Sequence, residues 1–268
     1  MSNKSLTLSL VIPVFNEERH LVACLDAVAK QSEMPDEVII VDNNSTDQSV
    51  AIVRQFKFVK LLREPRQHQA FAQKIGFDAA RGEILGRIDA DSRLPADWVA
   101  RLKQQFADQP GVVALTGTGL PYDTYLSDFF GRAIFDFYQP LASRIAGHQL
   151  LWGANCALRR QAWQAVSSRV LQRGDIWEDY DLAFALAAQG DIVFIKDLTI
   201  STSFRAVHKP LPTQVRYQLR SIRTFYFHKG PVAAILLAVL CGVMMLSLPL
   251  ILIDSYALKP LAGFDESI

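Results

Sequence analysis

Short apolar runs alternate with longer amphipathic stretches along the first 110 residues of the chain. Runs such as "LTLSLVIPVF" and "DEVIIVD" are typical of buried strands, and the stretches between them have the apolar spacing of a helix. The pattern predicts strands at 6–15, 36–42, 59–64 and 83–91, and helices at 16–31, 45–56, 70–82 and 95–109. Strands that alternate with helices predict an α/β fold with a doubly wound, mostly parallel sheet.

The second half of the chain has a less regular pattern. The segments 126–147 and 177–190 favour helices, and "DIVFIKD" at 191–197 favours a strand. "TGTGLPYDTY" at 116–125 is typical of a loop, and "WGANCALRR" at 152–160 favours an ordinary turn when it is taken alone. We therefore expect fewer regular elements after residue 110.

The segment 231–253, "PVAAILLAVLCGVMMLSLPLILI", contains no charged residue. A helix of this length would reach about 35 Å, which is enough to cross a bilayer. Six Lys or Arg residues and no Asp or Glu lie between 205 and 229, whereas Asp254, Asp265 and Glu266 follow the segment with only Lys259. The positive-inside rule then predicts a cell (inner) membrane protein whose N-terminal part faces the cytoplasm. A buried core helix is the alternative.

A basic segment precedes this predicted membrane helix. Arg216, Arg220 and Arg223 are spaced i, i+4, i+7, so they share one face of a helix. Such a face suits the headgroup layer of a membrane and favours contacts with anionic lipid or a diphosphate. The alternative is that these arginines only set the orientation of the membrane helix. The predicted organisation is an α/β domain at 1–205, a juxtamembrane segment at 206–230, a transmembrane helix at 231–253 and a C-terminal tail at 254–268.

Composition disfavours several classes of protein. The formal net charge of the 268 residues is +1, so the overall charge of the protein does not favour binding to nucleic acid. Cys24, Cys156 and Cys241 lie far apart without C-x-x-C spacing, which disfavours a disulfide framework or a zinc site. His208 is isolated in "AVHKP", and we interpret it as a loop histidine.

Acidic residues follow two of the predicted strands. Asp42 comes after "VIIV", and Asp89 and Asp91 come after "ILGRI". In open α/β sheets, ligands bind outside the carboxyl ends of the strands. At positions i and i+2, Asp89 and Asp91 point to the same side if the strand persists, so both can address one divalent cation and its phosphate-bearing ligand. Alone, such a pair is more often a pair of surface carboxylates, but its place after a buried strand favours the cation site.

Five motifs in a fixed order cover about residues 6–200. They are "VIPVFNEE" at 11–18, "VDNNSTDQS" at 41–49, the segment 63–92 that ends in "IDADS", "GANCALRR" at 153–160 and "EDYDLAFALAAQG" at 178–190. Together they resemble the inverting family 2 glycosyltransferases, whose nucleotide-diphospho-sugar domain has the GT-A fold. The resemblance implies an enzyme that transfers a sugar from a nucleotide-diphosphate donor and uses Mg²⁺ or Mn²⁺.

The resemblance implies roles for residues on the donor side. Asp42 would bind the nucleoside, with Pro13 and Glu17 beside it, and Asp89 would contact the ribose or the donor sugar. Carboxylates suit this role because they accept hydrogen bonds from base N–H groups and ribose hydroxyls. Asp91 would coordinate the cation together with the diphosphate.

The resemblance also implies roles on the acceptor side. Asp179 matches the family's catalytic base, which takes the proton of the acceptor hydroxyl while the oxygen attacks the anomeric carbon and inverts its configuration. Gly153 and Asn155 match the acceptor loop, where the first permits close approach and the second supplies hydrogen bonds; Glu178 accompanies them. Taken alone, "EDYDL" suits the acidic first turn of a helix equally well.

The chain departs from the family pattern at several positions. Asn43 stands where the family has a second Asp, and Gln73-Lys74 stands where many members have Arg-Asn. The nucleotide contacts can therefore differ; a UDP-sugar is the first choice, but the sequence does not decide the base. "QVRY" at 214–217 only approaches the Gln-x-x-Arg-Trp motif of processive members, which disfavours polymer synthesis.

We therefore expect a metal-dependent inverting glycosyltransferase that acts on a hydroxyl of a membrane-associated acceptor. One alternative is a polyprenyl-phosphate glycosyl synthase, whose acceptor phosphate is already ionised and has less need of a base. A second alternative, of another class, is a catalytically silent membrane scaffold that binds nucleotide sugars. The sequence does not reveal the sugar, the linkage, the oligomeric state or any membrane partner subunit.

Overall fold

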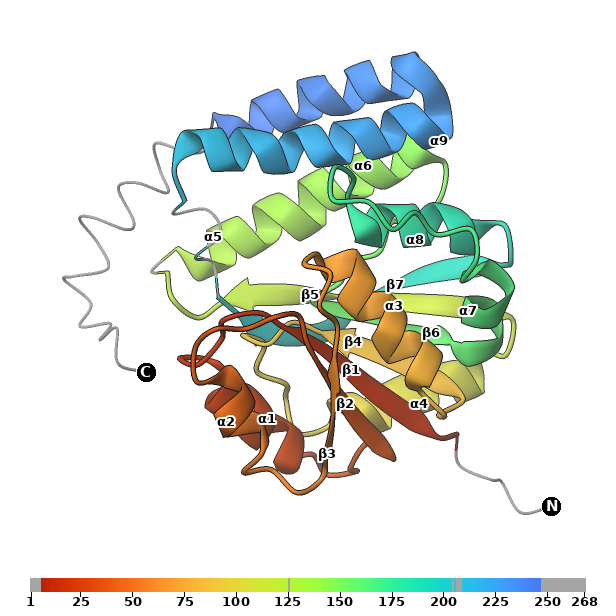
Figure 1. Cartoon of the computed structure of the whole chain (residues 1–268). Coiled ribbons are helices and arrows are strands. Elements are labelled where there is room, and N and C mark those ends of the chain that lie inside the picture. Colours follow the sequence, from red (N-terminus) through yellow and green to blue (C-terminus); the bar gives the residue numbers. More distant parts are fainter. Residues whose placement is uncertain (1–5, 125, 204, 206–208, 247–268) are drawn as a thin grey trace.

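The computed structural model describes residues 6–124, 126–203, 205 and 209–246. A seven-stranded sheet with the order β3-β2-β1-β4-β6-β5-β7 runs through this part of the chain (Figure 1). Its strands are β1 (Leu8–Val14), β2 (Glu37–Asp42), β3 (Val59–Arg63), β4 (Ile84–Ile88), β5 (Val112–Pro121), β6 (Asn155–Arg159) and β7 (Asp191–Thr202).

The first four strands are parallel, as the alternating pattern predicts. β6 runs antiparallel to both of its neighbours, β4 and β5, whereas β5 and β7 are parallel. The predicted α/β fold with a mostly parallel sheet is confirmed. Its carboxyl ends lie along one edge, where a ligand site is expected.

Two of the predicted loops are wrong, because 116–125 contains the end of β5 and 152–160 contains β6. The glycines of "TGTG" favoured a loop, but in the strand they allow neighbours to approach. A Cβ at Gly117 would meet Asn155 and the Leu198 carbonyl oxygen, and one at Gly119 would meet the ring of Trp152. Glycine in a strand interior marks such close contacts.

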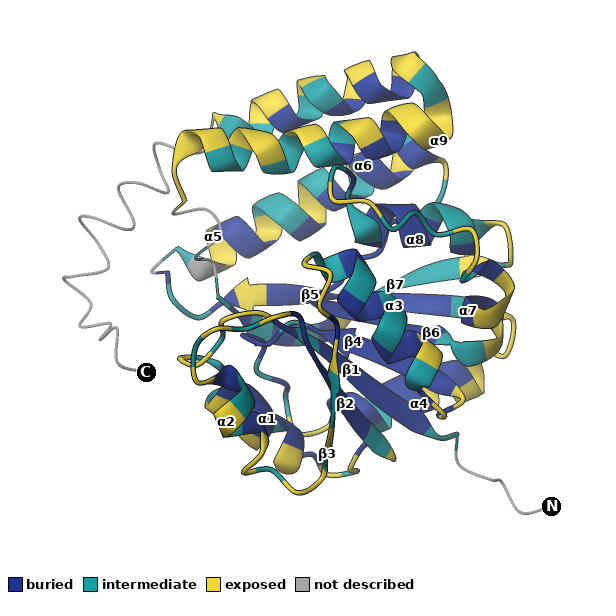
Figure 2. Ribbon diagram, in the orientation of Figure 1, coloured by how far each residue is buried: buried dark blue, intermediate teal, exposed yellow. Residues whose placement is uncertain are grey.

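Helices cover both faces of the sheet and build two apolar cores. Alternate residues of β1 point to opposite faces, so Leu10 and Ile12 belong to one core and Val11 to the other. The first core involves α1 (Leu21–Ala29), α2 (Ser49–Val53) and α4 (Trp98–Asp108), and the second involves α3 (Gln69–Ala79), α7 (Arg160–Val166) and α8 (Glu178–Ala187). The sheet between them is largely buried (Figure 2).

A further helical layer lies over α8. It contains α5 (Ser127–Arg132), the π-helical turn η1 (Ala133–Tyr138), α6 (Gln139–Ala146) and α9 (Leu211–Met245). α9 reverses direction at Gly230, where φ is 81° and ψ is −175°. The second arm, 231–245, runs back along the first arm, 211–229 (Figure 1), and Cys241 Sγ lies 3.9 Å from Ser221 Oγ.

This reversal bears on the predicted membrane helix at 231–253. Among the described residues, α9 is long and apolar enough to cross a membrane, with a mean hydropathy of 1.8 in its most apolar window. The described second arm would measure about 22 Å as a helix. Residues 247–253, the predicted tail at 254–268 and His208 lie outside the described residues. A transmembrane span therefore stays a prediction.

Candidate active site

A cavity of about 870 Å³ opens at the carboxyl ends of β1 and β4 and extends to α9. This volume is in the range of sites that bind small molecules. Carboxylates on one part of its lining come from the strand ends and from α8: Glu17, Asp89, Asp91, Glu178 and Asp179. Aromatic and apolar side chains on another part come from α5, η1, α9 and the segment before β6: Phe130, Ile134, Phe135, Trp152, Tyr217 and Met244.

The loops that follow β1 and β2 are hydrogen-bonded to each other. Asn16 adopts a left-handed conformation (φ 54°) and its Oδ1 accepts a bond of 2.8 Å from Thr46 N. Glu17 N donates to Ser49 Oγ at 2.8 Å. Asp42 is buried at the end of β2, where its Oδ1 accepts a bond of 3.0 Å from Ser45 N. Pro13 and Glu17 line the cavity, whereas Asp42 supports the loop beside it.

Arg205 joins two carboxylates at the acidic part of the cavity. Its guanidinium pairs with Glu17 and lies 3.1 Å from Asp91 Oδ2. Burial raises the pKa of Asp91 to about 7, and the charge of Asp89 adds to this effect. Burial also raises the pKa of Glu17, against the lowering effect of Arg205. These carboxylates therefore lie where an additional positive charge would be stabilising.

A divalent cation fits this site if its ligand supplies further oxygens. No three His, Cys, Asp or Glu side chains in the described part of the chain form a complete metal-binding cluster. Glu17 Oε2, however, is buried without a hydrogen-bond partner among the described residues. Mg²⁺ is commonly held by one or two carboxylates together with phosphate oxygens and water. Glu17 and Asp91 match that donor set.

Asp179 lies in the first turn of α8, where the partial positive charge of the helix stabilises acidic residues. Its Oδ2 accepts a bond of 2.8 Å from Gly153 N, and its Oδ1 accepts one from Arg87 Nη1. Burial raises the pKa of the Asp179 carboxyl to about 7, although the charge of Arg87 opposes this rise. A carboxyl with a pKa near neutrality is suited to accept a proton from a substrate.

The two arginines at the site were not among the residues predicted from the sequence. Arg87 stands alone as a charge in the buried run "ILGRI", a signal that could have indicated a buried ion pair. Arg205 offers no such signal, because its partners Glu17 and Asp91 are more than 100 positions away in the sequence. Between them, these cations compensate carboxylates on both sides of the cavity.

The predicted acceptor loop has a structural role within the described residues. Asn155 is completely buried, and its Nδ2 donates to the carbonyl oxygens of Thr118 and Leu198. Its Oδ1 accepts a bond of 2.9 Å from Trp98 Nε1. Asn155 and Gly153 do not line the large cavity, although their neighbours in sequence do. Their contact with an acceptor stays a prediction.

The three arginines of the first arm of α9 differ in position. Arg220 is half-buried and lines the cavity, with its guanidinium carbon 5.7 Å from the ring centroid of Tyr217. Arg216 and Arg223 are exposed and do not line it. The predicted diphosphate or lipid contact is therefore compatible with the cavity at Arg220, and the other two face the surface.

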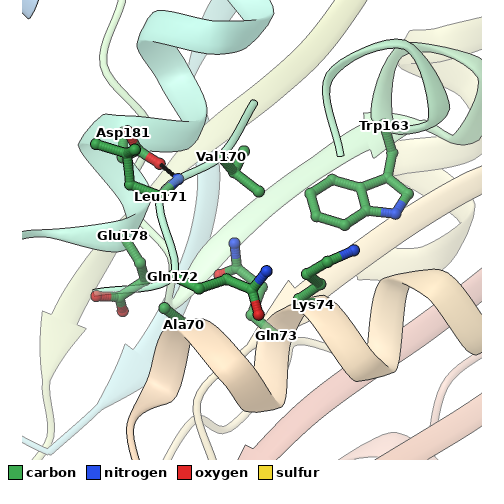
Figure 3. A pocket seen from close by; sticks show the side chains of 9 residues that line it. All are labelled: Ala70, Gln73, Lys74, Trp163, Val170, Leu171, Gln172, Glu178 and Asp181. Carbon is green, nitrogen blue, oxygen red and sulfur yellow. Dashed lines mark hydrogen bonds between the residues drawn. The ribbon is translucent and has the colours of Figure 1, made fainter. Parts of the chain in front are cut away.

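Gln73 and Lys74, where the chain departs from the family pattern, lie away from the large cavity. They line a small hollow of about 10 Å³ between α3 and the segment before α8 (Figure 3), which is too small for a sugar. Lys74 Nζ pairs with Asp78 Oδ2 at 2.6 Å. This departure therefore changes contacts beside the site rather than at it.

The mixed sheet, with carboxylates at its strand ends and a buried carboxylate in the same cavity, has the GT-A fold of sugar transferases. The chain belongs to glycosyl transferase family 2, whose sequence profile matches residues 9–166. It is thus an enzyme of the glycosyltransferase class, and the predicted family and fold are confirmed.

Curated relatives match less than half of the chain. Glycosyltransferase GlyG of Streptococcus pneumoniae is 30% identical over 128 residues, 46% of this chain and 42% of that protein. Glycosyltransferase AglE of Haloferax volcanii is 33% identical over 119 residues, 42% of this chain and 36% of that protein. An undecaprenyl-phosphate 4-deoxy-4-formamido-L-arabinose transferase of Aeromonas hydrophila is 35% identical over 38% of this chain and 34% of that protein. The matches thus span well under half of these relatives.

Solved structures share the fold. A mannosyltransferase of Pyrobaculum calidifontis, in complex with GDP-Man and Mn²⁺, superposes with a TM-score of 0.68 at 21% identity, covering 98% of this chain and 77% of that chain. Glucosyl-3-phosphoglycerate synthase of Mycobacterium tuberculosis, in complex with Mn²⁺, UDP and glucosyl-3-phosphoglycerate, has a TM-score of 0.60 at 17% identity, covering 84% and 80%. At these identities the likeness concerns the fold alone.

Proposed function

We propose that the chain is a metal-dependent inverting glycosyltransferase that moves a sugar from a nucleotide-diphosphate donor to a hydroxyl of a membrane-associated acceptor. The observation that carries this proposal is that the buried Asp179 lines the same cavity as Asp89 and Asp91. The carboxylates suited to hold a donor and the carboxylate suited to accept a proton therefore line the same cavity.

On the donor side, Pro13, Glu17 and Asp89 are proposed to contact the nucleoside and the donor sugar. The nucleoside contact of Asp42 stays a prediction; its Oδ1 accepts a hydrogen bond from Ser45 N in the loop after β2, and Ser45 Oγ accepts one from Asn16 N beside Glu17. The structural relatives described above contain GDP-Man in one case and UDP in the other. A UDP-sugar is our first choice, and the experiment below compares both bases.

Asp91 is proposed to hold Mg²⁺ or Mn²⁺. Mn²⁺ is present in both structural relatives, which supports the same class of ion here. When bound, the cation offsets the negative charge that develops on the leaving diphosphate. Arg205, beside Asp91 and Glu17, can add a second positive charge for the same phosphates.

Asp179 is the proposed general base. Gly153 N and Arg87 each occupy one of its oxygens, and a carboxylate still has further lone pairs for an acceptor hydroxyl. When Asp179 takes the hydroxyl proton, the acceptor oxygen forms a bond to the anomeric carbon. The bond from that carbon to the diphosphate breaks, and the diphosphate leaves with the electron pair. Attack from the opposite face inverts the configuration.

The acceptor is proposed to approach from the α9 side of the cavity, at the cytoplasmic face of the cell membrane. Exposed apolar side chains cover the second arm of α9, and Arg216 and Arg223 are exposed on the first arm. This combination of apolar and basic surface suits a membrane interface that contains anionic lipids. A lipid acceptor can then reach Asp179 without leaving the membrane completely.

A polyprenyl-phosphate acceptor is the second candidate. The Aeromonas relative is named as an undecaprenyl-phosphate transferase. Lys209 and Arg220 line the cavity, and cations of this kind pair with phosphate oxygens. A phosphate is already ionised, so this reaction would depend less on Asp179.

The test combines donor screening with a substitution of the base. The full-length protein in octyl glucoside, whose sugar hydroxyls can act as acceptors, is screened with UDP- and GDP-sugars by thermal shift, with and without Mn²⁺. We expect a Mn²⁺-dependent shift with one donor and release of its nucleoside diphosphate. In Asp179→Asn the release is expected to fall at least about 100-fold while the thermal shift persists.

The exposed Asp97 of the α4 N-terminus provides the matched control, because Asp97→Asn removes a carboxylate outside the cavity. Transfer to undecaprenyl phosphate that survives in Asp179→Asn would favour the polyprenyl-phosphate reaction. Binding of a donor without hydrolysis or transfer to any acceptor would favour the silent scaffold. Wild-type turnover of a hydroxyl acceptor by Asp179→Asn would contradict the proposed base.

A further inference from the structure

Arg87 is a buried cation in the centre of the sheet. It belongs to β4, which pairs with β1 on one side and with β6 on the other, and its side chain is 1% exposed. Removing a guanidinium from water is unfavourable unless hydrogen-bonded carboxylates compensate its charge. The position of this side chain therefore depends on the acidic residues around it.

The guanidinium bridges the two sides of the cavity. Its Nη2 lies 3.0 Å from Asp89 Oδ1, on the donor side, and its Nη1 donates to Asp179 Oδ1, on the acceptor side. Glu178 Oε1 is 3.7 Å from the same Nη2. The planar fork of arginine can hold two carboxylates in a fixed relative orientation, which a single ammonium group cannot do.

A second arginine of the sheet shows what a purely structural guanidinium does here. Arg159, in β6, donates to the carbonyl oxygens of Val112, Phe106 and Gln109 and ties the end of α4 to the sheet. Arg87, in contrast, directs both terminal nitrogens at carboxylates that line the cavity, and its Nε has no partner among the described residues. Its contacts are thus with the site rather than with the scaffold.

We propose that Arg87 is a positioning residue for sugar transfer, which orients the base Asp179 and the donor-side Asp89 relative to each other. This inference rests on the proposed function, in which Asp179 accepts the acceptor proton. With Oδ1 held by Arg87 and Oδ2 held by Gly153 N, the carboxylate cannot rotate, and its remaining lone pairs keep one direction. Correct orientation of a base contributes substantially to rate.

The charge of Arg87 has a second consequence for Asp179. Burial raises the pKa of Asp179, and Arg87 opposes that rise by favouring the ionised form, which is the form that acts as a base. The other groups that act on this environment are Asp89 from the loop after β4, Glu178 and Tyr180 from α8, Cys156 from β6 and Arg220 from α9. Loss of Arg87 should therefore raise the pKa of Asp179 further, so that the base becomes active only at higher pH.

Two substitutions separate charge from geometry. Arg87→Met removes the positive charge and the planar guanidinium, whereas Arg87→Lys keeps the charge but removes the guanidinium. Arg159→Met is the matched control, because it removes a second arginine of the sheet, one whose guanidinium donates to backbone carbonyl oxygens. For each full-length protein, nucleoside diphosphate release in octyl glucoside with Mn²⁺ and the donor found by thermal shift is measured from pH 5.5 to 9.5. The carboxyl signal of Asp179, assigned by its loss in Asp179→Asn, is titrated by NMR in parallel.

We expect Arg87→Met to move the acidic limb of kcat/KM, and the Asp179 titration, upward by about one pH unit or more. Its activity should partly recover at high pH. Arg87→Lys should titrate like the wild type but lose about 10- to 100-fold in kcat, because the base is no longer held in one orientation. Arg159→Met should lose thermal stability without a change in the acidic limb.

The proposal would be overturned if Arg87→Met had the wild-type acidic limb and the wild-type kcat. It would also be overturned if Arg87→Met and Arg159→Met lost the same fraction of kcat at every pH. If Arg87→Met does not fold, as judged by circular dichroism, Arg87→Lys decides: wild-type kcat in that variant overturns the role. The proposed function fails separately, because it is refuted when Asp179→Asn turns over at the wild-type rate. The NMR titration reports on the Arg87 contact even in that case.

Discussion

The absence of a side chain at position 153 allows Arg87 and Asp179 to meet. A Cβ at Gly153 would overlap Arg87 Nη1 and Asp179 Oδ1. The amide of the same residue donates to Asp179 Oδ2 at 2.8 Å. The sequence predicted that Gly153 permits a close approach, but it assigned that approach to the acceptor. In the structure, the groups that approach Gly153 are two side chains of the protein itself.

Gly153→Ala should therefore displace the base without removing it. We expect kcat to fall about 10- to 100-fold, because a shift of about 1 Å in a catalytic group has an effect of this size. Donor affinity, measured by Mn²⁺-dependent thermal shift, should change little. Gly111→Ala is the control, since a Cβ there meets nothing within 4 Å. A wild-type kcat in Gly153→Ala would show that the base tolerates displacement.

Sequence reasoning at the residue scale found groups that lie at strand ends and missed groups that depend on tertiary contacts. Asp89 and Asp91 follow a buried strand, and the edge rule for α/β sheets was sufficient to find them. Arg87 and Asp179 are 92 positions apart, and Arg205 and Glu17 are 188 positions apart. No local pattern could pair them. Their contacts arise only when α8 and the chain after β7 pack over the sheet.

At the scale of elements, the reversal of α9 at Gly230 determines where the apolar second arm packs. Gly230, with φ of 81° and ψ of −175°, is in a region of backbone space that is open essentially to glycine alone. The second arm then packs on the first, with Leu237 and Cys241 buried in the same core as Phe225. The dipeptide Gly230-Pro231 is a turn signal that the sequence contained. The sequence analysis placed the boundary between the juxtamembrane segment and the apolar helix at this dipeptide, but it did not predict that the helix reverses there.

Gly230→Ala should destabilise this hairpin of helices. A non-glycine residue in such a conformation costs about 1–3 kcal/mol, so we expect a lower melting temperature and faster proteolysis of α9. Gly242→Ala is the matched control, because a Cβ there meets nothing within 4 Å and alanine favours a helix more than glycine does. Equal melting temperatures for wild type and Gly230→Ala would mean that the reversal does not require glycine.

The sequence predicted well those elements whose hydrophobic pattern indicates either a strand or a helix without ambiguity. β1, β2 and β4 are buried on both faces, and their apolar runs, with the helices between them, predicted the parallel part of the sheet. β5 and β6 were missed because Gly, Thr and Asn weaken the strand pattern. Their pairing is set by Trp152, Asn155 and Thr116, whose contacts come from the assembled sheet.

At the scale of the whole molecule, one surface differs from the rest. The second arm of α9 has an exposed side (Figure 2), and its apolar residues Val232, Ile235 and Val239 are each more than 60% exposed. Apolar side chains gathered on one helix face usually contact a membrane or a partner. The exposed Arg216 and Arg223 of the first arm favour an anionic lipid surface.

Ile235→Asp combined with Val239→Asp should weaken binding to vesicles of phosphatidylethanolamine and phosphatidylglycerol. Insertion of one such side chain contributes about 1.5–3 kcal/mol, so loss of two should reduce the partition coefficient at least about 100-fold. Co-sedimentation measures this effect. Val22→Asp, at an exposed position of α1, is the control. Equal sedimentation of the double variant and the control would exclude this surface as the membrane contact.

β4 marks the boundary at which the sheet changes direction, since its neighbour on one edge is parallel and its neighbour on the other is antiparallel. In the proposed reaction, Glu17 and Asp89 contact the donor from the loops after β1 and β4, whereas 121–152 and 209–246 supply the aromatic and basic lining on the α9 side of the cavity. Exchange of these two segments between enzymes of this fold is expected to change which molecule is glycosylated while donor choice is retained. Arg87, Asp89 and Asp179 lie outside both segments, so such a graft leaves their ion pairs in place.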